Sequence, residues 1–461
     1  MALLMHLSNE LKLLVISHLE AILLTDSEMT SEYDEEGDGN EDDFPPLPPH
    51  SSISPSLIAL SQTNSLFRAL LAPSIFATLT LQNMSVSGAT ISAIASGEDA
   101  KFVKKIEYVA KVPFPDWDGK GAAPKSSDFP YEAEHVLTHL SLFPNLETLS
   151  IQFPFHVESL REQIDGQDPL ESAEVVREEE AKYGWRALMT SSYTAVAKNS
   201  VGVVKSLVLR NIVMKESSAW ETEEWRSFLR GLTKFDVSMR GWDNGAGWAT
   251  STYDAYTDFI DNFDHYFFDH LDNVTHLTLS FNEWGTAGTG GGYIGPLCFK
   301  AKHMPYLQHL TLDFVIVGEV LVQLLRTHSK TIETIDMKHA YAIEKWWHGD
   351  LTWAEFFDAL LANEPSYPNL RSCNIESPLL DWEAKDEARP DKPGEIRPRA
   401  VGIGRELLYA QISDKYGSIL TDALWREHDP DKAEVKPRDW AAYEKFMLFV
   451  EANKQERKVG H

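Results

Sequence analysis

The fold is decided by Phe143-Pro144-Asn145-Leu146-Glu147-Thr148-Leu149-Ser150-Ile151, a stretch whose spacing occurs twice more in the chain. Met304–Leu312 and Tyr367–Ile375 also place an aromatic residue or Met, then a Pro, ahead of three spaced apolar residues. A Pro lacks the amide donor that a helix needs and clashes with the preceding turn, so it ends a helix and leaves the chain extended. Each of the three stretches therefore predicts a strand that follows a helix.

The apolar part of this pattern, with spacings of three and then two residues, occurs nine times after residue 75. The nine triplets are Phe76, Leu79, Leu81; Val103, Ile106, Tyr108; Leu146, Leu149, Ile151; Val204, Leu207, Leu209; Leu232, Phe235, Val237; Val274, Leu277, Leu279; Leu307, Leu310, Leu312; Ile332, Ile335, Met337; and Leu370, Cys373, Ile375. Three fixed apolar positions are met by chance on the order of thirty times in a chain of this hydrophobicity, so the triplet alone is weak evidence. The Pro that three of them share, in the same phase, supports the assignment.

Helical apolar stripes lie between the predicted strands. They cover Tyr131–Leu142, Trp220–Leu232, Tyr253–Leu271, Val317–Thr327 and Leu351–Ala362. Alternating helices and short strands predict an α/β fold with a parallel sheet and the helices outside it, in which each unit buries its apolar side against its neighbours.

The strand pattern is similar to the core of a leucine-rich repeat, so residues 81–380 are predicted to form an irregular, curved α/β solenoid. Its insertions are expected at Ala110–Pro130, Gln152–Tyr183, Met239–Ser251 and Ser280–Pro296. The Asn that usually follows the strand of such a repeat is mostly missing, with Asn282 the clear exception. Residues 381–461 are predicted to be an extension that ends in a capping helix, Asp439–Gln455. The apolar side of that helix is Trp440, Tyr443, Phe446, Met447, Phe449 and Val450.

The first residues of the chain predict an amphipathic helix. Ser8 or Asn9 is a suitable N-cap, Glu10 lies in the first turn, and apolar residues recur at spacings of three and four. The stretch Leu7–Leu19 resembles the opening of an F-box, and Leu57–Phe76 resembles the later F-box helices of fungal F-box proteins with leucine-rich-repeat-like tails.

The resemblance implies a short helical F-box-like module at residues 1–80 that binds the Skp adaptor of a cullin-RING ubiquitin ligase. It assigns the adaptor-facing apolar surface, or the small core beneath it, to Leu7, Leu11, Val15, Ile16, Leu19, Leu60, Leu66 and Phe67. Ser8 stands where the family usually has Pro, and the link between the two pieces is unusually long. An interaction scaffold of similar repeats that does not bind the adaptor therefore stays open as an alternative.

That long link, residues 25–56, is acidic and then rich in Pro. Residues 26–43 hold ten Asp or Glu and no Lys or Arg. Like charges repel, and little apolar surface is available to offset an ordering entropy of about 1 to 2 kcal/mol per residue, so the insertion is predicted to be disordered.

Composition limits the classes of partner and chemistry. In 461 residues, 42 Lys and Arg stand against 70 Asp and Glu, and the formal charge of −28 disfavours nucleic acid and anionic membranes as partners. Only Cys298 and Cys373 are present, which excludes a disulfide framework and a multi-cysteine zinc site and fits the cytoplasm or nucleus. No stretch is apolar enough to predict a membrane span.

No catalytic, cofactor or metal motif is convincing. Gly290–Gly295 matches Gly-x-Gly-x-x-Gly, but it does not directly follow a strand and open a helix, as a dinucleotide site requires. The histidines show no His-Glu-x-x-His spacing, and no nucleophile elbow, phosphate-binding loop or kinase motif occurs. An enzyme on an α/β framework is therefore the most distant alternative.

The Gly-rich stretch Gly241–Trp248 carries two tryptophans, Trp242 and Trp248, that a loop cannot easily bury. Aromatic residues in loops often anchor partners, so both are possible substrate contacts, with a core role as the alternative. Taken together, the sequence predicts a non-enzymatic substrate-recognition subunit of a Skp-cullin-F-box ubiquitin ligase without a cofactor. The F-box would recruit the Skp adaptor, and through it a cullin, while the solenoid binds a protein substrate.

Overall fold

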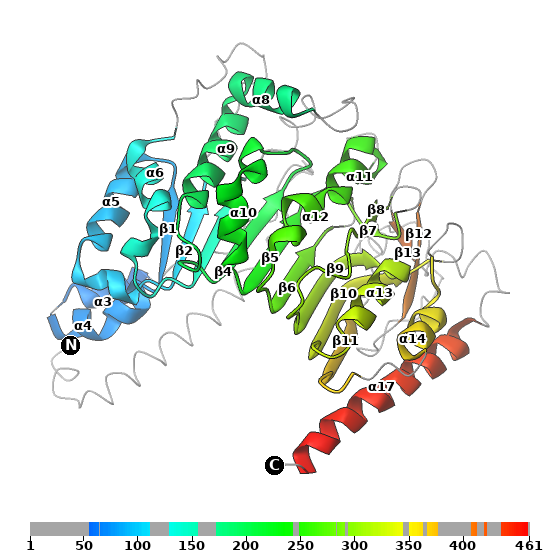
Figure 1. Ribbon diagram of the computed structural model, residues 1–461. Helices are drawn as coiled ribbons and strands as arrows, with labels where there is room; N and C mark the ends of the chain where they lie inside the picture. Colours follow the sequence, from blue (N-terminus) through cyan, green and yellow to red (C-terminus); the bar gives the residue numbers. More distant parts are fainter. Residues whose placement is uncertain are drawn as a thin grey trace, which may run out of the picture.

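The computed structural model describes residues 55–63, 65–110, 129–154, 172–242, 249–282, 284–290, 294–343, 350–362, 367–376, 407–412, 419–421 and 435–459. Within these ranges the chain is an α/β protein with one large sheet and twelve α-helices (Figure 1). The predicted α/β class with parallel strands is confirmed.

The nine predicted strands are all present. They are β1 (Thr78–Gln82), β2 (Lys105–Val109), β3 (Thr148–Gln152), β4 (Ser206–Ile212), β5 (Lys234–Met239), β6 (His276–Ser280), β9 (His309–Ile316), β10 (Thr334–Ala342) and β11 (Ser372–Glu376). Each strand lies parallel to the next one along this series. Four further strands complete the described sheet, namely β7 (Ala287–Gly288), β8 (Gly295–Pro296), β12 (Leu408–Ile412) and β13 (Ile419–Thr421).

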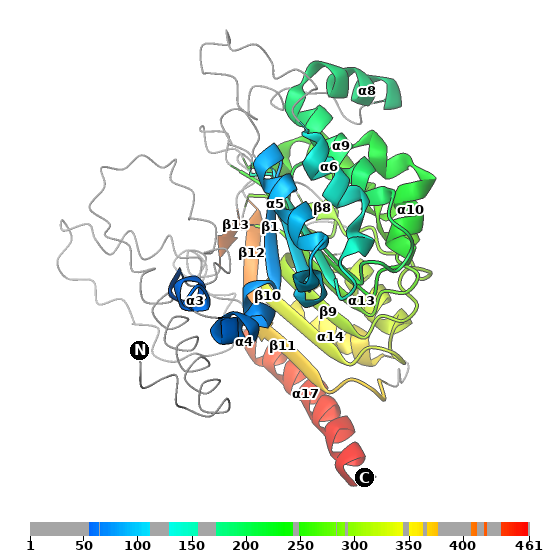
Figure 2. The same ribbon diagram turned by 90° about the vertical axis from the view of Figure 1, so that its left-hand side faces the viewer.

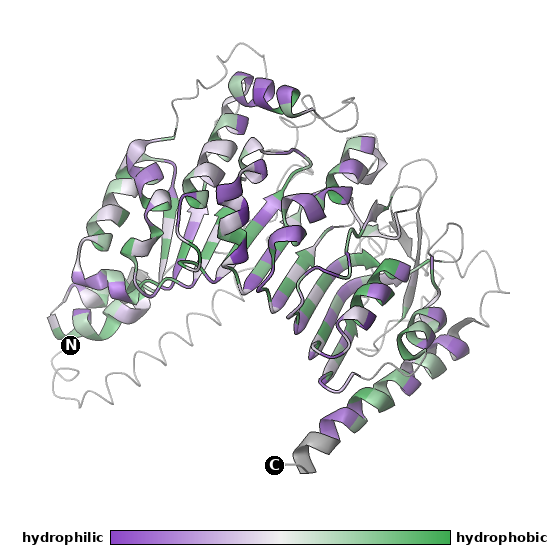
Figure 3. Cartoon of the chain, in the orientation of Figure 1, coloured by the Kyte–Doolittle hydropathy of each residue, from purple (hydrophilic) through white to green (hydrophobic). Residues whose placement is uncertain are grey.

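The register of the nine strands follows the sequence pattern. The second residues of the nine triplets form one continuous ladder: Leu79, Ile106, Leu149, Leu207, Phe235, Leu277, Leu310, Ile335 and Cys373. The third residues form a second ladder, from Leu81 to Ile375. Both ladders are buried, and the residues between them point to the opposite face, as the period of two in a strand requires. Figure 3 shows this alternation as bands along the strands.

A repeated backbone contact holds the units in this register. The carbonyl of Ala77, just before β1, accepts the N–H groups of both Lys104 and Lys105 at 2.9 Å. The same double acceptance connects each later unit to the one after it, with these carbonyls: Lys104, Glu147, Lys205, Thr233, Thr275, Gln308 and Glu333. A carbonyl oxygen has two lone pairs, so one residue can fix two donors of the next unit.

Asparagine side chains add a second contact between units. In three units the Asn before the first apolar residue donates its amide to a backbone carbonyl of the unit before, over 2.5 to 2.8 Å. The pairs are Asn145 with Lys101, Asn273 with Arg230, and Asn369 with Lys330. The Asn expected after a strand, Asn282, exchanges two hydrogen bonds with the backbone of Gly241 at the end of the neighbouring strand.

The helices cover one face of the sheet (Figures 1 and 2). They are α5 (Ser85–Ala95), α6 (Tyr131–Thr138), α8 (Ala173–Lys182), α9 (Gly184–Ala197), α10 (Glu223–Arg230), α11 (Asp254–Asp261), α12 (Phe263–Tyr266), α13 (Glu319–Thr327) and α14 (Trp353–Leu361). Short 3-10 turns occur at Glu98–Phe102, Leu140–Leu142, Ser218–Glu221, Thr250–Thr252 and Phe268–His270. The five predicted helices are confirmed, although Tyr253–Leu271 is divided into α11, α12 and a turn.

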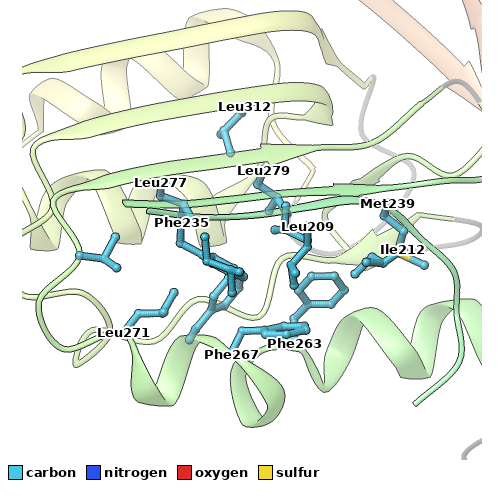
Figure 4. Close-up of a cluster of buried hydrophobic side chains, with 14 of the residues drawn as sticks. Leu209, Ile212, Phe235, Met239, Phe263, Phe267, Leu271, Leu277, Leu279 and Leu312 are labelled. Atoms are coloured by element: carbon cyan, nitrogen blue, oxygen red, sulfur yellow. The ribbon is translucent and has the colours of Figure 1, made fainter. Parts of the chain in front are cut away.

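The main core lies between this helix layer and the sheet. Figure 4 shows its centre, where Phe263 and Phe267 pack beneath Phe235 and the leucines of neighbouring strands. Burying a large apolar side chain contributes roughly 1.5 to 3 kcal/mol, so this continuous layer supplies most of the driving force for folding.

Two insertions contain more structure than the sequence indicated. Gln152–Tyr183 was expected to be an irregular insertion, yet α8 lies at its end and α9 follows. Glu180 of α8 accepts hydrogen bonds from the backbone N–H of Ser218, its hydroxyl, and the hydroxyl of Thr190. The insertion Ser280–Pro296 contains β7 and β8.

At the amino-terminal side, α3 (Pro55–Ser61) and α4 (Ser65–Ile75) precede the sheet. Both fall in the second F-box-like stretch. Phe67 and Leu71 form a small buried core there, separate from the main one, with Leu60 packed against it. The end of α4 leads into β1 after two residues. The first F-box-like stretch and the acidic insertion lie outside the described residues, except for Pro55 and Ser56, with which α3 begins before it continues into the second stretch.

At the other side, α17 (Val435–Val459) contains the predicted capping helix and packs against α14 and β11. Phe446 and Val450 are fully buried. Asp439, 1% exposed, accepts hydrogen bonds from the backbone N–H of Ala354 (2.9 Å) and the hydroxyl of Tyr409 (2.8 Å). Its carboxylate thus holds the first turn of α14, where negative charge is favoured. No described helix is both long and apolar enough to cross a bilayer.

This contact generates a prediction about local stability. Asp439→Ala leaves two buried donors without an acceptor, at a cost of roughly 1 to 3 kcal/mol for each. Because each unit contacts mainly its neighbours, hydrogen exchange measured by mass spectrometry should rise in α14, β11 and α17 but not in β2, β3 and β4. Glu444→Ala, at an exposed position of the same helix, is the control. Uniformly faster exchange in both regions would contradict the prediction.

Candidate functional site

The candidate site is the face of the sheet that the helices leave uncovered, called here the polar face. It consists of the first, third and fifth residues of the nine strands. The first row is Thr78, Lys105, Thr148, Ser206, Lys234, His276, His309, Thr334 and Ser372. The middle row is Thr80, Glu107, Ser150, Val208, Asp236, Thr278, Thr311, Asp336 and Asn374. The last row is Gln82, Val109, Gln152, Arg210, Ser238, Ser280, Asp313, Lys338 and Glu376.

Charge is sorted along these rows. The first row contains two lysines and two histidines and no acid, while the middle row contains three acids and no base. Ion pairs connect strands and rows: Lys105 lies 2.6 Å from Glu107, and Arg210 lies 3.2 Å from Asp236. Most of the remaining side chains are Ser, Thr, Asn and Gln, which offer both donors and acceptors. The face can therefore hold a polar polypeptide surface through many individual hydrogen bonds.

Asp236 has the most perturbed carboxyl group on this face. Burial raises its pKa, and the nearby charges of Arg210 and Lys105 only partly oppose that effect. One of its carboxylate oxygens is buried without a hydrogen-bond partner in the described structure. Such a group is suited to accept a hydrogen bond from a bound partner, because the oxygen is already removed from water before the partner binds.

Two imidazoles stack near the centre of the first row. The ring centroids of His276 and His309 are 4.1 Å apart. The hydroxyl of Thr275 lies 3.1 Å from the carbonyl of Thr233 and 2.8 Å from Nδ1 of His276. Burial, His309 and Lys234 lower the pKa of His276, which favours the neutral form of its ring.

Three strands bend at the same position of the pattern, the residue that directly follows the last row. Asn211, Phe314 and His339 directly follow the last row and adopt positive φ angles of 52°, 53° and 44°. This conformation is costly for residues other than Gly and is often found at functional or bent positions. The rings of Phe314 and His339 stack at 4.1 Å, and His339 Nδ1 lies 2.7 Å from Asp313. The bends redirect β9 and β10 towards a second small core around Ile316 and Tyr341.

A second cluster of titratable groups lies on the helix side and has the composition of a metal site. Ligand atoms of Asp264, Asp269 and His303 lie within 4.8 Å of one another. Lys300 is bonded to Asp264, however, and Lys302 to Asp269, so both carboxylates already have a cation. His303 accepts from the N–H of Lys300 at Nδ1 and donates to Asp269 from Nε2, so neither nitrogen is left for a metal. The cluster is best explained as a structural network.

Cys298, beside this cluster, is poorly suited to act as a nucleophile. Burial raises the pKa of its thiol to about 12. A thiol is reactive as the thiolate, which this environment suppresses at neutral pH.

The structure places the site residues predicted from the sequence in different environments, and some of them lie outside the described residues. Phe67 and Leu60 contribute to the small core of α3 and α4, and Leu66 is partly exposed. Leu7, Leu11, Val15, Ile16 and Leu19 lie outside the described residues. Trp248 also lies outside them.

The expectation that Trp242 contacts a substrate is wrong for this structure. Its side chain is 3% exposed and belongs to the main core. Three hydrogen bonds with Thr250 hold its backbone in place, two through the Thr250 hydroxyl (2.7 and 2.8 Å) and one from the Thr250 N–H (3.0 Å). A Gly-rich loop predicts an accessible tryptophan, but this side chain is part of the core that extends through the units.

Sequence reasoning did not identify the stacked histidines or the sorted charges. One signal was available, because His-Leu-Thr-Leu occurs at both residues 276–279 and residues 309–312. If two neighbouring strands are in register, the identical polar residues at corresponding positions of these stretches lie side by side. A scan against protein-family models finds no match for this chain, and a search of curated proteins finds no relative.

The structural network on the helix side generates a prediction. His303→Gln should lower the free energy of unfolding by about 1 to 3 kcal/mol, because it disturbs two buried hydrogen bonds. Added zinc or magnesium, and chelators, should leave the unfolding midpoint of the unmutated chain unchanged in urea titrations. A rise of the midpoint with zinc would show that the cluster binds metal.

Acid should destabilise the fold through its buried histidines. Burial lowers the pKa values of His303 and His328. The unfolded chain then takes up protons near its own pKa of about 6.5 while the folded chain does not, so stability is complete above that pH and falls below it. His328→Leu should lose less stability than the unmutated chain between about pH 7 and pH 5, as measured by urea unfolding. Equal losses would contradict this reading.

Proposed function

We propose that the chain is the non-enzymatic substrate-recognition subunit of a Skp-cullin-F-box ubiquitin ligase. In this proposal the helical module at the amino-terminal end recruits the Skp adaptor, and through it a cullin. The polar face binds a protein substrate, and catalysis lies in other subunits of the ligase, in the cytoplasm or nucleus.

The observation that carries the proposal is the direct junction between α4 and a series of nine register-matched units. The two helices have a small core of their own, and only two residues separate α4 from β1. A substrate held on the sheet would therefore keep a defined position relative to anything held by the helices. Such positioning raises the effective concentration of substrate lysines near the ubiquitin carrier.

The same units favour the finer interpretation of the fold as a leucine-rich-repeat-like solenoid. Among the nine units, strands that are neighbours in space belong to consecutive units, and a double-acceptor carbonyl connects each unit to the next. In solenoids each repeat contacts mainly its neighbours, and the strand-lined surface is extended and available for binding. A terminal repeat needs a cover, and α17 occupies that position at the carboxyl-terminal side.

The module also suggests which residues meet the adaptor. Phe67 is 3% exposed, so its role would be to support the module from within. Ile58, 40% exposed, and the partly exposed Leu66 would belong to the docking surface together with the apolar residues of Leu7–Leu19.

Capture by a Skp adaptor tests the proposal. The purified full chain should bind an immobilised adaptor, and Leu11→Asp or Leu66→Asp should weaken binding by about tenfold or more, because each places a charge in an apolar contact. Val201→Asp is the matched control, since Val201 is 58% exposed in a loop before β4 and far from the module in sequence. Hydrogen exchange in β2 to β6 should be unchanged in all three variants.

No capture of the unmutated chain, or equal capture of Leu11→Asp and Leu66→Asp, would refute adaptor binding. The remaining interpretation would be the interaction scaffold, which keeps the polar face and lacks the docking surface.

A further inference from the structure

One long segment of this highly charged chain has no charge at all. Residues 69–97 contain no Asp, Glu, Lys, Arg or His, although 24% of the whole chain is Asp, Glu, Lys or Arg. At that frequency a segment of this length would carry about seven charged residues. The segment comprises the end of α4, all of β1 and all of α5.

These uncharged elements form one edge of the sheet. Among the strands that the structure describes, β1 is terminal and pairs only with β2, and α5 is the first helix of the layer above it. Figure 2 shows β1 and α5 on the side that faces the viewer. The outward side of α5 is apolar or small: Val86 is 75% exposed, and Ala89 and Ala93 are also exposed.

The backbone of β1 has open pairing groups on this edge. The carbonyl of Ala77 bonds to β2, so alternate residues from 77 onward face β2 and the N–H and C=O of Thr78, Thr80 and Gln82 face away. Gln82 is satisfied locally, since its N–H donates to Ser87 and its C=O accepts from Met84. In the described part of the chain, Thr78 and Thr80 have no such partners. Unpaired edges of this kind are templates for another strand.

Charge decides between possible occupants. A second copy of a chain with a formal charge of −28 is repelled at most surfaces, and an uncharged surface minimises that repulsion. An edge strand is also self-complementary when two copies meet around a two-fold axis, because antiparallel pairing places the same strand on both sides. Natural edge strands that must stay unpaired usually carry Lys or Pro, and β1 has neither.

We propose that two copies of this chain form a two-fold dimer through antiparallel pairing of their β1 strands. Thr78 of one copy lies opposite Thr80 of the second copy, and Thr80 lies opposite Thr78, so that four N–H to C=O bonds form around the axis. Leu79 faces Leu79 of the second copy. This inference is independent of adaptor binding.

The register is the one that keeps each face of the sheet continuous. Opposite residues in an antiparallel pair point to the same side, so Thr78 and Thr80 meet on the polar face and the two Leu79 side chains meet on the helix side. The axis is perpendicular to the sheet, which places the two α5 helices next to each other. Val86, Ala89 and Ala93 would then be covered by their counterparts. Both polar faces would open in the same direction as one surface.

Mass measurement of the full chain tests the dimer. Light scattering after gel filtration should give twice the chain mass of 52.0 kDa. Val86→Asp should raise the dissociation constant about tenfold or more, since it puts two like charges into an apolar contact. Thr80→Pro should do the same by removing an outward N–H without touching the bonds to β2. Val201→Asp, an equally polar change at an exposed site elsewhere, should leave the dimer intact.

Disulfide trapping tests the register. In a hydrogen-bonded antiparallel pair the Cα atoms are about 5.5 Å apart, which a disulfide can span. The double variant Thr78→Cys, Thr80→Cys should therefore give a covalent dimer on a non-reducing gel under mild oxidation. Each single variant places its two cysteines about 8 Å apart and should stay monomeric on the gel, like the unmutated chain.

A chain that is monomeric at all concentrations would overturn the proposal, and so would a dimer that Val86→Asp and Thr80→Pro leave unchanged. Efficient trapping by either single cysteine variant would overturn the register. Circular dichroism and the urea midpoint of each variant, compared with those of Val201→Asp, separate loss of dimer from loss of fold.

Discussion

The structure depends on one repeated constraint, a carbonyl at the start of a strand that accepts two N–H groups from the next unit. It occurs first at Ala77 and last at Glu333, and it sets each new strand in the same register as the one before. Because side chains alternate along a strand, a register error of one residue would move every apolar residue to the wrong face. The two apolar ladders and the repeated carbonyl therefore reinforce each other.

This constraint explains where the rest of the molecule can vary. Unit lengths differ greatly, yet the strand starts do not shift, because the insertions enter at the ends of strands or in the helix layer. The helix α8 illustrates this: Glu180 attaches it to Ser218 and Thr190 in the helix layer. Where strands do change direction, at Asn211, Phe314 and His339, they do so just beyond the regular rows.

The polar face is the consequence that matters most for function. The two apolar ladders lie on the helix side, so most positions of the opposite side carry hydroxyls, amides, sorted charges and the stacked pair of His276 and His309. These groups lie on a rigid sheet, which lowers the entropy cost of presenting them to a partner. The two ends of the described sheet differ. α17 packs against the last units, whereas β1 and α5 form an uncharged edge. If the protein is a binding subunit, it therefore has two candidate binding surfaces, the polar face and that edge.

The sequence by itself determined the local elements. Apolar spacing and Pro positions predict the nine strands, five of the helices that cover the sheet, and the capping helix. These depend on contacts between residues near in sequence, and Pro144 disfavours a continuing helix through its missing N–H and its ring. The absence of charged residues in residues 69–97 is also visible in the sequence, but the location of this segment at the edge of the sheet is not. Only the tertiary structure decided which side chains became neighbours. Asp439 meets Ala354, and Glu180 meets Ser218, across long stretches of chain. Trp242 was misplaced for the same reason, because its burial depends on the packing of neighbouring units and not on its own Gly-rich surroundings.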